Sequence, residues 1–252
     1  MNVLAIDASP LKNKGNTALI LLPFLEGMSA AGADTELICT SDLHIHPCNG
    51  DLSCLFHPEG RCIHRDDMDR IMPKIRDADI LIFATPLFVD GFAGPMKTLM
   101  DRMIPLFQIF MEKYGGHTRH PLKEQKNRRT VLFSSRGFWE LDNFDPIVTH
   151  MRAVTRNLNG EFAGALLRPH ASLLKSMLAT GAPVQDIQKA ARQAGELLVR
   201  DGSIPTSCLE TISRPLLPQD DYLTMNNQRF TELIESRRNR ANGLAHMSGG
   251  SG

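Results

Sequence analysis

Two short, uninterrupted apolar runs constrain the fold of this chain more than any other feature of its sequence. They lie at Asp79 to Ala84 (DILIFA) and at Arg129 to Ser134 (RTVLFS). Such runs are typical of β-strands that are buried on both faces, as in parallel sheets covered by helices on each side. The sequence therefore predicts a sheet with two covered faces.

Further strand-like segments alternate with helix-like ones along the chain. Three more strands are predicted at Asn2 to Asp7, Thr35 to Thr40 and Glu161 to Leu167. Helices are predicted at Thr17 to Ala31, Asp66 to Arg76, Gly94 to Tyr114, Asn143 to Leu158, Pro183 to Arg200 and Asp221 to Arg240. This alternation implies an α/β fold with a doubly wound, five-stranded parallel sheet. Ligands of such sheets bind at the carboxyl ends of the strands, so the loops after the first, third and fourth strands form the candidate site.

The composition argues against several classes of function. The 28 basic and 28 acidic residues cancel, so no overall field favours nucleic acid or an anionic membrane surface. No apolar stretch approaches the roughly 20 residues of a membrane helix, and the opening MNVLAIDASP is typical of a strand rather than a signal peptide. Five cysteines without an export signal indicate a reducing compartment. We therefore expect a cytoplasmic protein that binds neither nucleic acid nor a membrane.

The loop after the first strand, SPLKNKGNT, is rich in small and hydroxylated residues and opens a helix. Backbone N–H groups at a helix N-terminus attract phosphate. The hydroxyls of Ser9 and Thr17 and the amide of Asn16 offer further hydrogen bonds, and Lys12 or Lys14 adds a positive charge. The loop has neither the P-loop pattern nor that of a dinucleotide fold. It predicts a phosphate site of another kind, with an ordinary capped turn as the alternative.

The loop after the third strand combines a stiffening proline with aromatic residues. Pro86 restricts the turn that leaves the strand, and the backbone at Leu87 and Phe88 lies within reach of a planar ring. The Phe88 side chain is suited to stacking on or flanking that ring, whereas packing in the core is the alternative for Phe88 and the expectation for Phe92. Lys97 and Arg102 are interpreted as structural, pairing with Asp101 or with a neighbouring subunit.

These loops resemble, in the correct order, the flavin-binding loops of the NADPH-dependent FMN reductase and iron–sulfur flavoprotein families. The first resembles the SxRxxGNT-type phosphate loop, and residues 86–102 resemble the signature PVYFGSVSGQLKxFxDR. The loop SSRGFWE after the fourth strand stands where the family's third flavin loop does. The resemblance covers roughly residues 1–170 and implies a flavodoxin-like fold that binds FMN. Two residues depart from the signature: Asp90 replaces a usual glycine, and Val89 replaces an aromatic residue or a second glycine.

The resemblance implies a set of FMN-binding residues. They are Ser9, Lys12, Asn16, Thr17, Pro86, Leu87, Phe88, Val89, Ser135, Arg136 and Gly137. In the third loop, Gly137 permits a close approach of the backbone to the ligand. Ser135 and Arg136 are expected to bind the polar edge of the flavin, although pairing of Arg136 with Glu140 is an equal alternative.

The segment at 41–65 carries three of the cysteines. Cys48, Cys54 and Cys62, followed by Asp66-Asp67-Met68, resemble the CxxCxxC cluster motif of the iron–sulfur flavoproteins with its fourth cysteine, but Asp51 stands in the second ligand position. A [4Fe–4S] cluster normally takes four thiolates, and no standard zinc spacing is present. We therefore predict no metal and interpret the segment as a substrate or subunit-contact insertion, with a bound cluster as the open alternative.

The domain organisation follows from these segments. We expect a flavodoxin-like FMN-binding domain at 1–200 that contains the insertion at 41–65, a helical C-terminal extension at 201–246 and a flexible tail at 247–252. Arg168 and His170 form one polar pair that is able to face a ligand, and the adjacent acids Asp220 and Asp221 are expected to start a helix.

The resemblance implies an FMN-dependent oxidoreductase that passes electrons from NAD(P)H to a quinone, a flavin or a similar small-molecule acceptor, as a homodimer or homotetramer. Because the flavin carries the chemistry, no catalytic side chain is predicted. The alternatives are a non-enzymatic electron carrier and a binding protein that has lost the cofactor. The natural acceptor, and the choice between NADPH and NADH, stay open at this point.

Overall fold

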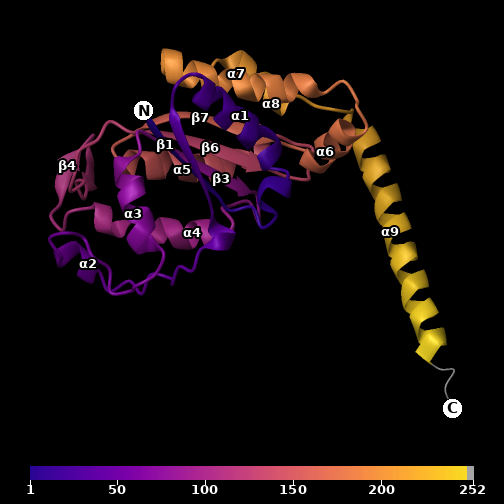
Figure 1. Ribbon diagram of the computed structural model, residues 1–252, viewed down its shortest axis with the longest axis horizontal. Coiled ribbons are helices and arrows are strands. Elements are labelled where there is room, and N and C mark those ends of the chain that lie inside the picture. The colour runs from indigo at the N-terminus through magenta and orange to yellow at the C-terminus, as the bar shows by residue number, and fades with distance from the viewer. Residues whose placement is uncertain (249–252) are drawn as a thin grey trace. The chain divides into compact units, whose positions relative to one another are not determined.

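The computed structural model describes residues 1–248 and divides into two units, Met1–Arg214 and the part from Pro215 onward (Figure 1). The first unit contains a five-stranded sheet in which every neighbouring pair is parallel, in the order β2-β1-β3-β6-β7. Its strands are β1 (Asn2–Asp7), β2 (Asp34–Cys39), β3 (Ile80–Pro86), β6 (Arg129–Ser135) and β7 (Glu161–Arg168). The doubly wound, flavodoxin-like sheet expected from the sequence is thereby confirmed, and its strand order reverses between β1 and β3.

Two layers of helices cover the sheet. One layer holds α3 (Met68–Asp77), α4 (Gly94–Asp101) and α5 (Asp145–Asn157), whose apolar side chains share one buried cluster with the strand residues Leu4, Phe83 and Leu132. The other holds α1 (Ala18–Ala30), α7 (Gln185–Asp201) and α8 (Thr206–Ser213) (Figure 1). On that side the rings of Phe24 and Phe133 meet edge to face, with centroids 5.0 Å apart. Burial of both faces explains why the strands read as uninterrupted apolar runs.

Helices α1 and α7 approach each other through two glycines. A Cβ atom at Gly27 would lie 1.9 Å from the carbonyl oxygen of Arg192, and one at Gly195 would lie 2.1 Å from the carbonyl oxygen of Phe24. Each glycine is therefore required, because the backbones of the two helices approach too closely to leave room for a side chain. The close packing fixes α1, and with it the loop that precedes α1.

One predicted helix, Gly94 to Tyr114, is wrong in its second half. Helix α4 ends at Asp101, a 3-10 turn at Ile104–Leu106 contains Pro105, and an antiparallel hairpin of β4 (Glu112–Tyr114) and β5 (His117–Arg119) follows. Proline lacks the N–H that an α-helix needs at an interior position. Gly115 and Gly116 join the two strands with φ values of 56° and 81°, as a two-residue hairpin turn requires.

The remaining described elements are short or terminal. They are the 3-10 turns at Lys12–Lys14, Thr40–Asp42 and Asp142–Phe144, and the helices α2 (Ser53–Phe56), α6 (Ala171–Ala179) and α9 (Gln219–Ser248). Helix α9 forms the second unit and carries Asp220 and Asp221 in its first turn, which confirms that these acids start a helix. Of the tail expected at 247–252, residues 249–252 lie outside the described part of the chain.

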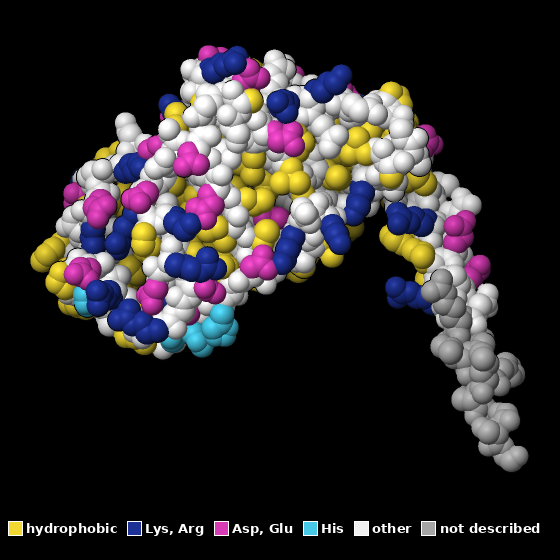
Figure 2. Space-filling model, in the orientation of Figure 1, with side chains coloured by type: hydrophobic (Ala, Val, Ile, Leu, Met, Phe, Trp, Pro, Cys, Tyr) yellow, Lys and Arg dark blue, Asp and Glu magenta, His cyan; other side chains and the backbone are white. Residues whose placement is uncertain are grey.

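The charged surface is mixed. Figure 2 shows basic and acidic side chains interspersed on the visible face, in keeping with a formal net charge of zero. Within residues 1–248, no helix is both long enough and apolar enough to span a membrane.

Candidate functional site

Three loops that are far apart in the sequence meet around one cavity of about 340 Å³. They follow β1, β3 and β6, the strands on either side of the point where the strand order reverses. The cavity is lined by Ser9, Pro10, Leu11, Gly15, Asn16, Thr17, Pro86, Leu87, Phe88, Ser135, Arg136 and Gly137. Of the residues expected to bind a flavin, all but Lys12 and Val89 are therefore brought together at the carboxyl edge of the sheet.

The loop after β1 forms the floor of one end of the cavity. The Ser9 amide donates to the Asp7 carboxylate at 2.8 Å, which folds the chain back over the end of the strand. A Cβ atom at Gly15 would lie 2.2 Å from the Ser9 hydroxyl oxygen, so a larger residue here would force the Ser9 side chain to move. Helix α1 then begins, and its first N–H groups have no partner within the helix. This end of the cavity therefore presents backbone donors suited to a phosphate.

Asp7 lies beneath that loop and is almost fully buried. Burial raises the pKa of its carboxyl group to about 6, against a smaller lowering by the hydrogen bond from Ser9. The proton therefore leaves this group about two pH units later than it would in solution. Nothing in the sequence pattern had indicated a role for Asp7 beyond ending a strand.

Thr17 joins the two ends of the cavity. It stands at the N-cap position of α1, but its side chain does not cap the helix. Instead its hydroxyl lies 2.8 Å from that of Ser135, the last residue of β6, and both side chains are buried. The phosphate-type loop and the third loop are thus bonded directly to each other.

Lys12 and Val89 lie outside the residues that line the cavity. Lys12 forms an ion pair with Asp42, and the hydrogen bond to that carboxylate raises the pKa of the lysine. Val89 is fully exposed at the tip of a tight turn. Their assignment as flavin-binding residues stays a prediction, and the geometry places them at the rim.

The loop after β3 forms the opposite wall. Phe88 and Gly91 exchange backbone hydrogen bonds of 3.2 and 3.1 Å and so close a turn whose two central residues have positive φ, 48° at Val89 and 58° at Asp90. The ring of Phe88 is half exposed and lines the cavity, so it does not belong to the core. Phe92, by contrast, packs against the apolar cluster beneath, as expected.

Thr85 was not identified from the sequence, although it braces this loop. Its hydroxyl donates to the carbonyl of Pro86 at 2.9 Å and accepts the Ala93 amide at 3.1 Å. The side chain is fully buried. A threonine at the end of an apolar strand carries no special signal, because its partners lie in the loop that it helps to fold.

Arg136 lies in the loop after β6, lines the cavity and forms an ion pair with Asp90 of the loop after β3. Its guanidinium also lies 4.2 Å from the centroid of the Phe138 ring. The ion pair that was expected as an alternative, with Glu140, is replaced by one with the residue that departs from the family signature. The Arg136 amide donates to the carbonyl of Arg168 at 3.0 Å, which ties this loop to the end of β7.

Arg168 and His170, the polar pair that was considered for ligand contact, are fully buried. The Arg168 guanidinium donates to the carbonyl oxygens of Pro169, Ile212 and Arg214. Burial lowers the pKa of Arg168 to about 10 and that of His170 to about 4, the latter also through the charge of Arg168. These contacts indicate that the pair holds the chain after β7 together.

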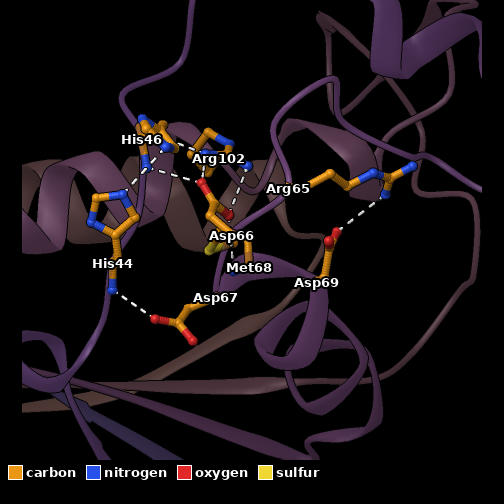
Figure 3. A network of polar contacts seen from close by, with 8 residues as sticks. All are labelled: His44, His46, Arg65, Asp66, Asp67, Met68, Asp69 and Arg102. Carbon is orange, nitrogen blue, oxygen red and sulfur yellow. Dashed lines mark hydrogen bonds and ion pairs between the residues drawn. The ribbon is translucent and has the colours of Figure 1, made fainter.

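The cysteine-bearing segment is clamped by the two acids that precede α3 (Figure 3). Asp66 accepts hydrogen bonds from the amides of His46, at 2.9 Å, and Met68, at 3.0 Å, and Asp67 accepts one from the His44 amide. A buried ion pair joins Asp66 to Arg102 at 2.6 Å. Burial raises the pKa of the Asp66 carboxyl, but the hydrogen bonds from Arg102 and the backbone outweigh it, so that the pKa is lowered overall.

The structural roles expected for Lys97 and Arg102 agree with their contacts, although Arg102 pairs with Asp66 rather than Asp101. Lys97 pairs with Asp101 at 2.6 Å, as predicted. Arg102 turns inward to Asp66 and donates to the carbonyl of His46 at 2.7 Å. Adjacent positions on a helix face different directions, so Asp101 remains at the surface while Arg102 is buried.

The donor set of the cysteine segment does not fit a four-thiolate cluster. Asp51, in the second ligand position, accepts the Ser53 amide at 2.9 Å. Cys54 is buried, and Lys123 binds the carbonyls of Cys54 and His57. Among residues 1–248, no three or more His, Cys, Asp or Glu side chains form a group that could hold a metal ion. Hydrogen bonds with Asp66, Asp67 and Lys123 hold the cysteine-bearing segment in place.

The cavity between the three loops does fit FMN. Its lining combines small side chains at the start of α1 with an exposed phenylalanine from the second loop and a glycine-containing stretch from the third. A Cβ at Gly137 would meet no other atom within 4 Å, so space is open beside this backbone. The cavity therefore offers hydrogen-bond donors for an anion and open space for a flat ring.

Comparisons with known proteins show the family of this chain. A family model described as NADPH-dependent FMN reductase matches residues 1–142. An iron–sulfur flavoprotein of Methanocaldococcus jannaschii is 37% identical over 119 residues, which are 46% of this chain and 60% of that protein. The chain thus matches less than two thirds of the length of that relative.

Solved structures show the same fold at lower identity. An FMN-dependent NADH-azoreductase from Bacillus anthracis in complex with FMN gives a TM-score of 0.56 at 16% identity, covering 79% of this chain and 100% of that one. An NAD(P)H:quinone oxidoreductase from Methanothermobacter marburgensis gives 0.52 at 19% identity, covering 79% and 96%.

Proposed function

Because this chain belongs to the NADPH-dependent FMN reductase family, we propose that it is an FMN-dependent oxidoreductase that passes electrons from NADH or NADPH to a small acceptor. The observation that carries the proposal is the convergence of three loops on one cavity at the reversal of the strand order. A cavity of a few hundred Å³ with a polar end and an apolar end is typical of cofactor sites.

Each loop has a distinct part in holding FMN. The N-terminus of α1, with Ser9, Asn16 and Thr17, binds the phosphate. Pro86, Leu87 and Phe88 form one wall for the ring, and residues 135–137 meet its polar edge. Lys12 and Val89 act from the rim, where Lys12 adds positive charge and Val89 adds apolar surface.

The bound flavin supplies the redox chemistry, and the chain binds, orients and shields it. No side chain is required to move a proton to a substrate, and none of the cavity residues forms a pair suited to acid–base catalysis. The protein's part is therefore to leave one face of the ring accessible to the nicotinamide and then to the acceptor.

A quinone, a flavin or a similar flat acceptor suits the rim of the cavity. Phe88, Val89 and Phe138 all expose more than half of their surface there. Exposed apolar side chains around a site favour flat, weakly polar partners. The family's usual assembly as a homodimer or homotetramer, and a place in the cytoplasm, remain part of this proposal.

Two measurements test the proposal. The purified protein is expected to take up FMN with the absorbance bands of an oxidised flavin, and the bound flavin is expected to bleach when NADPH or NADH is mixed with it in a stopped-flow instrument. Addition of a quinone should then restore the oxidised spectrum. Bound FMN that neither nucleotide reduces would indicate an electron carrier instead, and a protein that does not take up FMN would contradict the proposal altogether.

A further inference from the structure

The turn between Phe88 and Gly91 has an unusual backbone for its sequence. Both central residues lie in the left-handed region, which glycine and asparagine adopt most easily. Val89 is β-branched, a type of residue that is rarely found there. A turn of this kind persists only when surrounding contacts hold it.

The contact that holds the turn joins it to another of the three loops around the cavity. The Asp90 carboxylate pairs with the Arg136 guanidinium, although the two residues are 46 positions apart and belong to different loops. The Arg136 side chain is only 15% exposed, whereas that of Asp90 is 55% exposed. Stacking on Phe138 fixes the guanidinium from a second side.

From this geometry we propose that Asp90 is a positioning residue that holds Arg136 and neutralises its charge beside the ring of the flavin. The inference rests on the proposed function, because it requires FMN in this cavity. Arg136 lines the cavity, so its charge acts on the bound ring, and Asp90 is its counter-ion. The pair therefore sets how strongly the site favours reduced over oxidised flavin.

The direction of the effect follows from charge. Two-electron reduction of FMN with uptake of one proton adds one negative charge to the ring. An uncompensated guanidinium nearby stabilises that anion, and a neighbouring carboxylate cancels most of the stabilisation. Asp90 thus keeps the flavin a stronger reductant than Arg136 alone would allow.

The test compares holoproteins that differ only in charge. Asp90→Asn removes the negative charge and retains a residue that tolerates positive φ. Arg136→Gln removes the positive charge, and the double variant removes both. Asp101→Asn is the matched control, because Asp101 also forms a half-exposed ion pair, but its partner Lys97 does not line the cavity, whereas Arg136 does.

The measurements are the dissociation constant of oxidised FMN and the midpoint potential of the bound flavin. We expect Asp90→Asn to raise the preference for reduced over oxidised FMN by about tenfold, which for two electrons corresponds to about 30 mV. Arg136→Gln should shift it in the opposite direction, and the double variant should lie close to the wild type. Asp101→Asn should leave both quantities unchanged.

The outcomes separate this inference from the proposed function. If all proteins bind FMN but Asp90→Asn has the potential of the wild type, the role of Asp90 is wrong and the flavin assignment stands. If Arg136→Gln does not fold, the Asp90→Asn comparison decides alone. A wild-type protein without affinity for FMN would overturn both.

Discussion

The hydroxyl groups of Thr17 and Ser135 lie 2.8 Å apart, although 118 residues separate them in the sequence. Thr17 belongs to the loop that leads into α1, and Ser135 is the last residue of β6. A buried bond of this kind fixes the distance between the phosphate end and the ring end of the cavity. Several measurable consequences follow from this and from the other contacts of the site.

Replacement of Thr17 by valine should weaken FMN binding about tenfold and lower the free energy of unfolding by about 1 kcal/mol, because one buried hydroxyl loses its partner. The matched control is Thr130→Val. Thr130 pairs with Thr155 through buried hydroxyls at the opposite end of β6. It should cost similar stability in urea denaturation without changing FMN affinity, and an equal loss of affinity in both variants would contradict the assignment.

Replacement of Gly15 by alanine should reduce FMN affinity by about tenfold, because the new methyl group would overlap the Ser9 hydroxyl and force that side chain out of its position in the loop. Gly94→Ala serves as the control, since a Cβ there would meet no atom within 4 Å. Fluorescence titration with FMN measures both. Unchanged affinity in Gly15→Ala would mean that the observed position of the Ser9 hydroxyl is not needed to bind FMN.

Replacement of Arg102 by alanine should lower the free energy of unfolding by about 3–5 kcal/mol, because it leaves the buried Asp66 carboxylate without its cation. Lys97→Ala breaks an exposed pair and should cost less than about 1 kcal/mol. Chemical denaturation of both variants provides the comparison. Similar costs for the two would show that the Asp66–Arg102 pair does not stabilise the cysteine-bearing segment.

Asp7 should make the FMN-free protein less stable as the pH rises. The folded pKa of about 6 exceeds the 3.8 of the carboxyl in an unfolded chain, so the protonated form is favoured by folding. Its contribution is fully present below pH 3.8 and is lost as the pH passes through 6, a change of about 3 kcal/mol. Asp7→Asn should therefore match the wild type near pH 4 and exceed it at pH 7 in urea denaturation. A pH-independent difference would exclude this titration.

Replacement of Asp51 by cysteine should create the four-thiolate set that the wild-type segment lacks. After anaerobic treatment with iron and sulfide, Asp51→Cys is expected to gain iron and a broad visible absorbance beyond that of the flavin, whereas the wild type is not. Asp69→Cys, which adds a thiol on α3 outside the segment, is the control. A wild-type protein that takes up about four irons under the same conditions would show that Asp51 replaces a thiolate as ligand.

The sheet was predictable from the sequence because burial on both faces leaves a local signature. The run at 129–134 lies within β6, which ends one residue later at Ser135, and the run at 79–84 overlaps β3, which begins at Ile80 and ends two residues later at Pro86. The positions of the loops were also predictable, because a loop that follows a buried strand begins where that strand ends. The order of the strands and the convergence of the three loops then follow from general rules for parallel sheets.

The contacts that finish the site were not predictable in this way. Each of these contacts joins residues from different elements, and the sequence around one residue does not indicate its partner. The pairs are Thr17 with Ser135, Asp90 with Arg136 and Asp66 with Arg102. The hairpin at 112–119 was missed for another reason. Apolar residues before it suggested a longer helix, although the Gly115-Gly116 pair favours a two-residue turn.

Arg168 connects the loop after β6 to the chain at the end of α8. Its carbonyl receives the Arg136 amide in the third loop, while its guanidinium holds the carbonyls of Ile212 and Arg214. A mutation that loosens the segment after α8 would therefore reach the third loop of the proposed FMN site through a single residue. The redox behaviour proposed for this protein is expected to respond to changes around Ile212, which lies 44 positions beyond Arg168 in the sequence.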